Sequence, residues 1–442
     1  MIKRHKKIPY PDYIAKLFPE LFATQTEGSP PSARTITMKV TDDCNLRCTY
    51  CYQTCKKKKS MSFETAKTFI DYLLGEPDPD YINPVNSPAV VIDFIGGEPL
   101  LEIGLIRRIS DYFSTQLILK NHPWAERYVF SICTNGILYF DERVQAYIDQ
   151  YKDHLSINIT LDGNRELHDA CRVFPDGSPS YDIVIRAVKD CLKRGMGKGT
   201  KITISPDNVG YLYGAVLHMV ELGFRDINAN CVFEDVWDNA VHPAIFYREL
   251  KKTADYFIEK DIVETHFISL FEEDFFKPKE EADNENWCGG NGKMLACDPD
   301  GDLYPCIRYM ETSLGGKQKP MAIGNIREGI GCTKDCRDCI ASLREVTRRS
   351  QSTEECFHCP VAAGCSWCSA FNYQTFGTVN KRATFICGMH KANALANYYF
   401  WNTFYRKKGL PERARIYLPW DSAREIIDRA EYDMLLKLAQ ED

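Results

Sequence analysis

The sequence lacks the features that would direct it to a membrane, to export or to nucleic acid. No apolar run reaches the ~18 residues that a membrane-spanning helix needs. The N-terminus is basic, but Pro9, Tyr10 and Pro11 stand where a signal peptide would have its apolar core. The net charge of −6 gives no basis for binding nucleic acid or a membrane surface. We therefore predict a cytoplasmic protein with neither partner.

Internal repeats are also absent, and the bulk composition is that of an ordinary globular protein. Hydrophobic residues make up 44% and charged residues 26% of the chain. At 442 residues the chain exceeds the usual size of one hydrophobic core, which predicts two or three domains.

Cysteine is the abundant exception, with 19 residues. Disulfide frameworks belong mostly to short secreted domains, and this chain is long and has no export signal. Clustered cysteines here indicate metal ligands. Cys133, Cys171, Cys191 and Cys231 stand singly among apolar segments, where buried small hydrophobes are expected.

From about residue 34, short β-branched runs alternate with longer amphipathic runs, a pattern that predicts βα units and a parallel sheet. Strands are predicted at 35–40, 90–95, 128–134, 156–161, 201–205 and 226–232, and helices at 13–22 and 61–74. Residues capable of chemistry follow several strands directly. In parallel α/β folds such residues meet at the carboxyl edge of the sheet, where sites form.

The second half of the chain changes character. Residues 242–276 are predicted to be helical, and from about 287 cysteine, glycine and proline become dense. Two closing helices are predicted at 389–405 and 422–439. The expected organisation is an N-terminal extension (1–34), a barrel (35–240), a helical bridge (241–285), a metal-organised domain (286–390) and C-terminal helices (391–442).

Cys44, Cys48 and Cys51 are separated by three and then two residues, and Gly96-Gly97-Glu98-Pro99 follows at a predicted strand end. Thiolates suit iron–sulfur centres, which normally take four of them, so three leave one iron open to a small molecule. A zinc site completed by Cys55 is the alternative reading of the cysteines.

These residues resemble the radical S-adenosylmethionine (SAM) enzymes, and the likeness covers about residues 34–400. It implies an α/β fold with a partial (β/α)6 barrel. It also implies a 4Fe-4S cluster on the three cysteines, at which SAM is reductively cleaved to a 5′-deoxyadenosyl radical. By resemblance, the residues that contact this cofactor pair are Tyr50, Gly96, Gly97, Glu98, Pro99, Thr134, Asn135, Thr160 and Arg172. Arg172 would pair with the carboxylate of SAM, for which a guanidinium fork is suited.

The later cysteines resemble the SPASM domain of radical enzymes that modify peptides and proteins. That likeness implies two auxiliary 4Fe-4S clusters. The first would be held by Cys288, Cys297, Cys306 and Cys368, and the second by Cys356, Cys359, Cys365 and Cys387. The last close pair is separated by two residues where the family usually has three. If Cys297 is not a ligand, the first auxiliary cluster keeps an open iron for a substrate thiolate.

A further trio, Cys332, Cys336 and Cys339, repeats the spacing of the first motif. It would ligate a metal, exchange disulfides or engage substrate cysteines. Nothing after it matches the glycine–glutamate element, which argues against a second radical site.

Ile307 follows Cys306, where the sulfatase-maturing members of the group carry an acidic residue. The stretch from Cys365 to Tyr373 resembles maturases of cysteine-repeat peptides instead. The leading hypothesis is a radical SAM oxidoreductase that installs sulfur-to-carbon thioether links in a ribosomally made precursor peptide, as in natural product biosynthesis. A flavodoxin- or ferredoxin-type electron donor is expected. No residue is assigned as catalytic.

Two alternatives stay open: carbon–carbon cross-linking or epimerisation of a peptide by the same radical start, and a zinc-binding scaffold without redox chemistry. Many such maturases carry an N-terminal leader-binding module, but only 34 residues precede the first predicted strand. Leader recognition is therefore expected elsewhere, by strand addition to a sheet edge or through the C-terminal helices.

Overall fold

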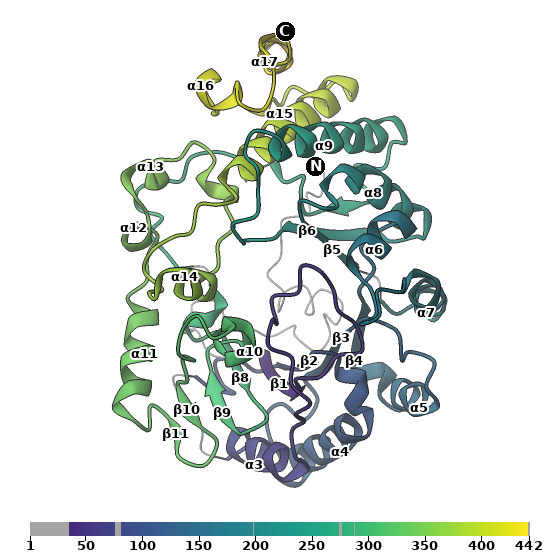
Figure 1. Cartoon of the computed structure of the whole chain (residues 1–442), viewed down its shortest axis with the longest axis vertical. Helices are drawn as coiled ribbons and strands as arrows, with labels where there is room; N and C mark the ends of the chain where they lie inside the picture. The colour runs from purple at the N-terminus through teal and green to yellow at the C-terminus, as the bar shows by residue number, and fades with distance from the viewer. Residues whose placement is uncertain (1–34, 76–80, 198, 274–275, 287, 441–442) are drawn as a thin grey trace.

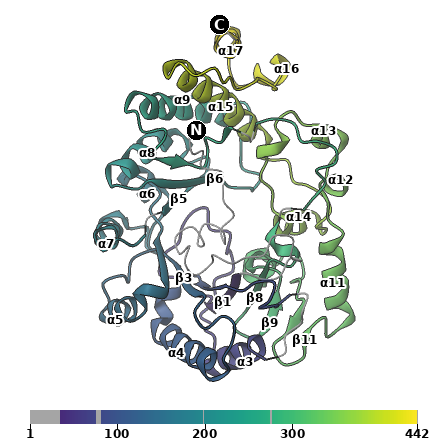
Figure 2. The ribbon, with the colours of Figure 1, turned by 180° about the vertical axis from the view of Figure 1, so that it is seen from behind.

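The fold was obtained as a computed structural model, which describes residues 35–75, 81–197, 199–273, 276–286 and 288–440. It is an α/β fold in which parallel strands curve around a central space, with helices outside (Figures 1 and 2). The predicted helix at 13–22 lies outside the described residues. No helix in the described ranges is long and apolar enough to cross a membrane.

Strands and helices alternate through the first half of the chain, as the sequence pattern predicts. The strands are β1 (Thr35–Thr41), β2 (Val90–Gly96), β3 (Tyr128–Thr134), β4 (Leu155–Ile159), β5 (Gly199–Ile204) and β6 (Asp226–Cys231). The helices are α3 (Phe63–Leu73), α4 (Ile103–Leu119), α5 (Glu142–Tyr151), α6 (Arg165–Cys171), α7 (Tyr181–Lys193), α8 (Leu212–Glu221) and α9 (His242–Glu259). All six predicted strands are confirmed, with ends that shift by at most two residues.

The parallel strands fall into two hydrogen-bonded sheets. Strands β1 to β4 pair in sequence order, and β5, β6 and a short β7 (Phe267–Ile268) form the second sheet. The prediction of continuous helix over 242–276 is wrong in its second half. Asp261 has a positive φ of 55°, just past the C-cap of α9, and β7 then pairs with β6. The chain therefore leaves the helix and adds one more strand to the sheet.

The cysteine-rich region is joined to the barrel through the first sheet. Its strands are β8 (Met294–Cys297), β9 (Asp302–Tyr304), β10 (Gly324–Asn325) and β11 (Gly329–Ile330). Strand β8 runs parallel to β1 on the side away from β2, and β9 to β11 continue in antiparallel order. The eight-stranded sheet therefore connects the two regions through backbone hydrogen bonds.

Short helices surround this hairpin region and a long helix closes the chain. They are α10 (Glu311–Leu314), α11 (Lys334–Arg344), α12 (Arg348–Gln351), α13 (Glu354–Phe357), α14 (Ser369–Phe376), α15 (Cys387–Lys407), α16 (Trp420–Ala423) and α17 (Arg429–Leu438). Helix α15 packs along α9, and Phe400 of α15 stacks on Phe271, which follows β7, with ring centroids 4.2 Å apart. The single helix predicted at 422–439 is wrong, because the chain turns after Ala423 and Asp428 caps a new helix.

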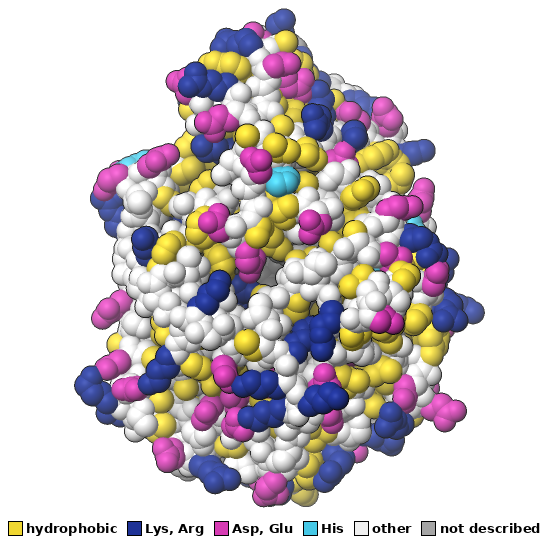
Figure 3. All heavy atoms as spheres, viewed as in Figure 1, with side chains coloured by type: hydrophobic (Ala, Val, Ile, Leu, Met, Phe, Trp, Pro, Cys, Tyr) yellow, Lys and Arg dark blue, Asp and Glu magenta, His cyan; other side chains and the backbone are white. Residues whose placement is uncertain are grey.

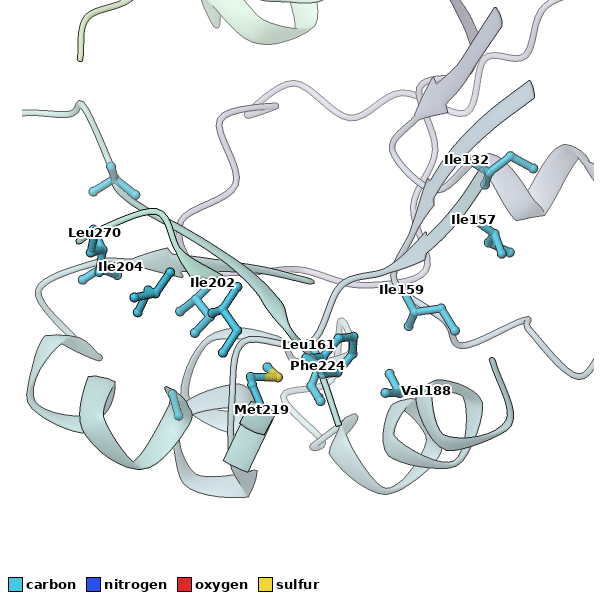
Figure 4. Packing of buried hydrophobic residues seen from close by; sticks show 14 of the residues in the cluster. Ile132, Ile157, Ile159, Leu161, Val188, Ile202, Ile204, Met219, Phe224 and Leu270 are labelled. Atoms are coloured by element: carbon cyan, nitrogen blue, oxygen red, sulfur yellow. The ribbon is translucent and has the colours of Figure 1, made fainter. Parts of the chain in front are cut away.

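The barrel strands send apolar side chains outward to the helices and polar ones inward. Ile202 and Ile204 of β5 are buried on the same side as Met219 of α8. Ile157 and Ile159 of β4 are likewise buried on the side that faces the helices (Figure 4). Successive residues of a strand point to opposite faces. The residues that alternate with these isoleucines along the strands, Lys201 among them, therefore face the interior of the barrel.

Candidate functional site

The loop after β1 carries Cys44, Cys48 and Cys51. Cys44 is buried, and the other two are partly exposed. The three thiols are close enough to influence one another. Burial raises the pKa of the Cys48 thiol, and the neighbouring thiols raise it further.

Two glycines hold this loop against the end of β2. The Gly97 amide donates to the Thr41 carbonyl at 3.1 Å, and the Glu98 amide donates to that of Asp43 at 2.8 Å. A Cβ atom on Gly97 would stand 2.2 Å from the Asp43 oxygen. Only glycine permits so close an approach of two backbones. The Gly-Gly-Glu turn is thus the support on which the cysteine loop is built.

Glu98 ties the ends of β2 and β3 together. Its carboxylate accepts hydrogen bonds from Thr134 Oγ1 at 2.6 Å and from the Asn135 amide at 2.8 Å, and it also caps the turn that Pro99 opens. The Asn135 side chain donates to Asn45 at 2.7 Å and lies 3.9 Å from the Cys44 sulfur. Burial raises the pKa of Glu98. This network links the Gly-Gly-Glu turn to the first cysteine.

A second network reaches Cys48 from β4 and α6. Arg172 Nε donates to the Asp162 carboxylate at 2.7 Å, and Nη1 lies 3.8 Å from the Cys48 sulfur. The guanidinium also lies 5.5 Å from the ring centre of Tyr50, whose hydroxyl donates to Asp162. The Thr160 amide joins this edge to β3 by donating to the Thr134 carbonyl at 2.9 Å. Asp162, which the sequence analysis does not assign to the site, is therefore its central acceptor.

The predicted cofactor-contacting residues thus gather at the carboxyl ends of β1 to β4. The barrel interior adds polar groups that the sequence analysis does not predict: Asp93 of β2, Cys133 of β3, Asn158 of β4, Lys201 of β5 and Asn228 of β6. Alternation within each strand is the pattern that reveals them, because each stands between residues that face the helices.

Cys133 and Lys201 are exposed within this interior. The prediction that Cys133 is a buried small hydrophobe is wrong. For Cys171 and Cys191 the same prediction is confirmed, and Cys231 is half-buried. Among the described residues, no hydrogen bond or ion pair engages the Lys201 ammonium group.

The later cysteines form separate groups. Cys288, Cys306 and Cys368 border one small apolar cluster, and burial and the other two thiols together raise the pKa of Cys306. Cys297 stands apart: it is fully buried on β8 in the main core, and its thiol donates to the Asp298 carbonyl at 3.4 Å. The structure therefore brings three of the four predicted thiols of the first auxiliary site together, and not Cys297.

The four thiols predicted for the second auxiliary site lie together. Burial raises the pKa of Cys387 to about 12, and the thiols of Cys365, Cys356 and Cys359 contribute to that increase. Arg382 Nη1 lies 3.6 Å from the Cys356 sulfur. This arginine stands beside its thiol group much as Arg172 stands beside Cys48.

The extra trio occupies the start of α11. Thr333 caps this helix and Cys336 is buried in its first turn, while burial and the nearby Cys336 thiol raise the pKa of Cys332. Cys339 lies one turn further along. Across the described ranges, no three His, Cys, Asp or Glu side chains converge as ligands of one metal ion. The thiolates that hold an iron–sulfur cluster bind its different iron atoms and so surround it.

Comparisons with known proteins agree with this geometry. Residues 38–208 match the Radical SAM superfamily. These residues form a radical SAM domain. An uncharacterised protein of Methanocaldococcus jannaschii is 31% identical over 191 residues, which cover 43% of this chain and 60% of that relative. The radical SAM cyclopropyl synthase TigE of Paramaledivibacter caminithermalis is 21% identical over 379 residues, 81% of this chain and 72% of TigE.

A solved structure has the same fold. The structure of anSMEcpe with bound AdoMet and the Cp18Cys peptide aligns with a TM-score of 0.61 at 17% identity, covering 84% of this chain and 99% of anSMEcpe. At that identity the likeness establishes the fold alone. The matched range, residues 38–208, contains the second half of β1, all of β2 to β5 and every residue of the two networks around Cys44 and Cys48.

Proposed function

We propose that this protein is a SAM-dependent radical maturase that installs thioether links in a cysteine-containing precursor peptide. The observation that carries the proposal is the pair of three-thiol groups. One, at Cys44, Cys48 and Cys51, lies in the radical SAM domain, and the other, at Cys288, Cys306 and Cys368, lies in the cysteine-rich region. Each has one thiolate fewer than a fully ligated four-iron cluster takes.

The residues around the first group fit a 4Fe-4S cluster. Three donors face the sulfurs of its cysteines: the Leu46 backbone amide and the Asn135 side-chain amide at Cys44, and the Arg172 guanidinium at Cys48. Hydrogen bonds to cluster sulfurs and nearby positive charge set the potential of such a site. When bound there, SAM supplies the 5′-deoxyadenosyl radical that removes a hydrogen atom from a substrate carbon.

The protein's own task is to orient the cofactor and the substrate. Asp162 holds the Arg172 guanidinium in place, and Glu98 holds the turn that supports the cysteine loop. The polar interior carries Lys201 and Asn228, which offer hydrogen-bond donors to a peptide that enters the barrel. Positioning of this kind decides which hydrogen is removed.

The second three-thiol group favours sulfur chemistry. With Cys297 buried elsewhere, an auxiliary cluster on Cys288, Cys306 and Cys368 would have a position open to a substrate thiolate. Forming the link removes one C–H and one S–H hydrogen as the C–S bond forms, so the product is oxidised by two electrons. The four-thiol group at Cys356, Cys359, Cys365 and Cys387 would hold a second auxiliary cluster, suited to receiving an electron.

TigE supports radical SAM chemistry and also raises a second candidate product. Its name describes a cyclopropyl synthase, and it aligns over 81% of this chain. Carbon–carbon bond formation in a peptide by the same radical start is therefore the alternative product. A cytoplasmic location fits this proposal, because thiols stay reduced in the cytoplasm and can serve as cluster ligands.

Mass spectrometry after anaerobic reconstitution tests the proposal. With a short cysteine-rich precursor peptide and SAM, we expect a loss of two hydrogens per link and one fewer thiol that iodoacetamide can alkylate. The same mass loss with every thiol still open to alkylation would favour carbon–carbon linkage. Epimerisation would be indicated by a peptide whose mass is unchanged in unlabelled solvent but which takes up deuterium in deuterated solvent. Reconstituted protein should hold about twelve irons with matching sulfide. Two or three zinc ions instead would support the scaffold alternative.

A further inference from the structure

The interior of the barrel holds a lysine without a counter-charge. Lys201 lies on β5 between two buried residues, Thr200 and Ile202, and its side chain faces the space that the strands enclose. Within the described ranges its ammonium group makes no hydrogen bond and no ion pair. Burial by the surrounding walls lowers the pKa of Lys201. Charges in such places are normally paired, which points to a partner that binds there.

The carboxylates of the barrel interior do not pair with this lysine. Asp162 acts on it electrostatically, but that carboxylate already accepts from Arg172 Nε at 2.7 Å and from the Tyr50 hydroxyl. Asp93 also faces the interior, from β2, and forms no ion pair with Lys201. Besides burial, the charge of Arg172 lowers the pKa of Lys201. The immediate surroundings of the lysine therefore add positive charge to it.

A second cation acts on the same space from the cysteine-rich region. The Arg308 guanidinium lies 4.6 Å from the ring centre of Tyr52, in the first cysteine loop, and 5.9 Å from that of Phe371 in α14. Its Nη2 group is buried without a hydrogen-bond partner, and Glu234 approaches it only to 3.6 Å. After burial, the charge of Arg308 is one of the causes that lower the pKa of Lys201. The two cations therefore act on one region.

This region lies between two thiol groups. Arg308 stands two residues after Cys306 of the second three-thiol group, and Arg172, which acts on Lys201, lies 3.8 Å from the Cys48 sulfur. The face of the molecule is hollowed near its centre, with acidic and basic side chains around the hollow (Figure 3). A group bound by both cations would therefore lie between the residues that would hold SAM and the second three-thiol group.

We propose that Lys201 and Arg308 bind the carboxylate of an aspartate or glutamate side chain in the precursor peptide. The inference rests on the proposed function, because only a peptide-modifying enzyme admits such a side chain to the barrel. A guanidinium fork and an ammonium group are donors suited to a carboxylate, and charge-assisted hydrogen bonds of this kind are strong. A carboxylate is also the anion that an unmodified peptide offers. The precursor therefore carries an acidic residue that is fixed between the two thiol groups.

Local roles for the two cations predict something different. Arg308 is close to Cys306 and Cys368, so it also balances the charge of the thiolates there. The thiol that acts on Lys201 is that of Cys133, which belongs to no predicted cluster. A contact between Lys201 and SAM is the remaining alternative. Lys201 is therefore the residue to change, and its variants must be tested for SAM affinity as well as for peptide affinity.

The test measures binding and requires no turnover. The probes are the short cysteine-rich precursor peptide and the same peptide with every aspartate and glutamate replaced by asparagine and glutamine. Reconstituted protein with SAM should bind the acidic peptide about tenfold or more tightly than its amide form, because a charge-assisted hydrogen bond is lost with the carboxylate.

The variants locate this preference at the lysine. Lys201→Met should lose it, and Lys201→Arg should keep most of it. Lys152→Met is the matched control, because it removes an exposed lysine from the turn after α5 and should change neither peptide affinity. The Kd of SAM should be the same in the unmodified protein and in all three variants.

Equal binding of the two peptides by the unmodified protein, or no binding of either, would overturn the proposal. A preference that survives in Lys201→Met would also overturn it. Weaker SAM binding in that variant would place Lys201 in the cofactor site instead. If Lys201→Met does not fold, Lys201→Gln takes its place, and the comparison of the two peptides on the unmodified protein stands by itself. Binding that depends on the acidic residues, with no change in peptide mass on turnover, would support this inference and refute the proposed function.

Discussion

The thiol group in the radical SAM domain and those in the cysteine-rich region are built in contrasting ways. Cys44, Cys48 and Cys51 lie within eight residues of one loop, which the Gly97 turn supports from β2. The auxiliary groups collect cysteines from distant parts of the chain: Cys288 meets Cys368 across eighty residues. A local motif is preorganised by one turn, whereas a distributed site depends on the whole regional fold.

Both kinds of site share one electrostatic feature. Arg172 lies 3.8 Å from the Cys48 sulfur, and Arg382 lies 3.6 Å from that of Cys356. A guanidinium close to thiolates stabilises their charged form. The difference between the sites therefore lies in how the thiols are assembled and not in how their charge is balanced.

The largest effect should come from removing a thiol of the local group. Cys48→Ser should abolish 5′-deoxyadenosine formation, because loss of a ligand exceeds the ~10–100-fold cost of losing an outer-shell partner. Cys368→Ser should retain 5′-deoxyadenosine formation and lose only peptide product. Chromatography of 5′-deoxyadenosine measures the first quantity and mass spectrometry the second. If both variants lowered SAM cleavage equally, the two regions would not have the separate roles that we predict.

The next effect should come from the support of the local loop. Gly97→Ala places a methyl group against the Asp43 backbone, where overpacking costs about 1–3 kcal/mol and displaces the cysteines. We expect a lower melting temperature and a loss of about four irons per chain. Gly104→Ala is the matched control, since a Cβ there meets no atom within 4 Å. Full iron content in Gly97→Ala would show that the loop does not need this turn.

A third comparison separates two cysteines of the distributed site. Cys297 is fully buried on β8 in the main core, whereas Cys288, Cys306 and Cys368 border the smaller apolar cluster. Cys297→Ala should therefore keep its iron, whereas Cys306→Ala should lose about four irons per chain. Iron and sulfide analysis of the reconstituted variants provides the measurement. Iron loss in Cys297→Ala would place it among the ligands, as the sequence resemblance implies.

The same contrast explains what could be predicted from the sequence. Strand positions and the loop of Cys44 follow from local patterns, and the structure confirms all six strands. Strand β8 beside β1 could not be anticipated, because nothing local in four residues specifies a partner more than 250 positions away. The separation of Cys297 follows from that pairing. Cys133 and Lys201 were open to prediction, since inward and outward residues alternate along β3 and β5.

The smallest expected effect concerns pH and the residues behind the barrel site. His168 of α6 is buried, accepts a hydrogen bond from the Asp162 amide at 3.4 Å, and lies 3.0 Å from Ser180 Oγ. Burial, aided by Arg172, lowers the pKa of His168 to about 3. The unfolded chain binds a proton at this residue below about pH 6.5 while the folded chain does not, so stability falls as pH decreases from about 6.5 toward 3.

Between pH 7 and pH 5 this residue should therefore remove about 2 kcal/mol of folding free energy. His168→Gln should be less stable than the unmodified protein at pH 7 and should lose less on acidification. The difference in melting temperature between the two proteins, taken at each pH, cancels acid effects on clusters that both carry. A melting-temperature difference that stays the same at every pH would mean that His168 is protonated in the folded protein. The radical SAM domain would then tolerate a buried charge beside Arg172.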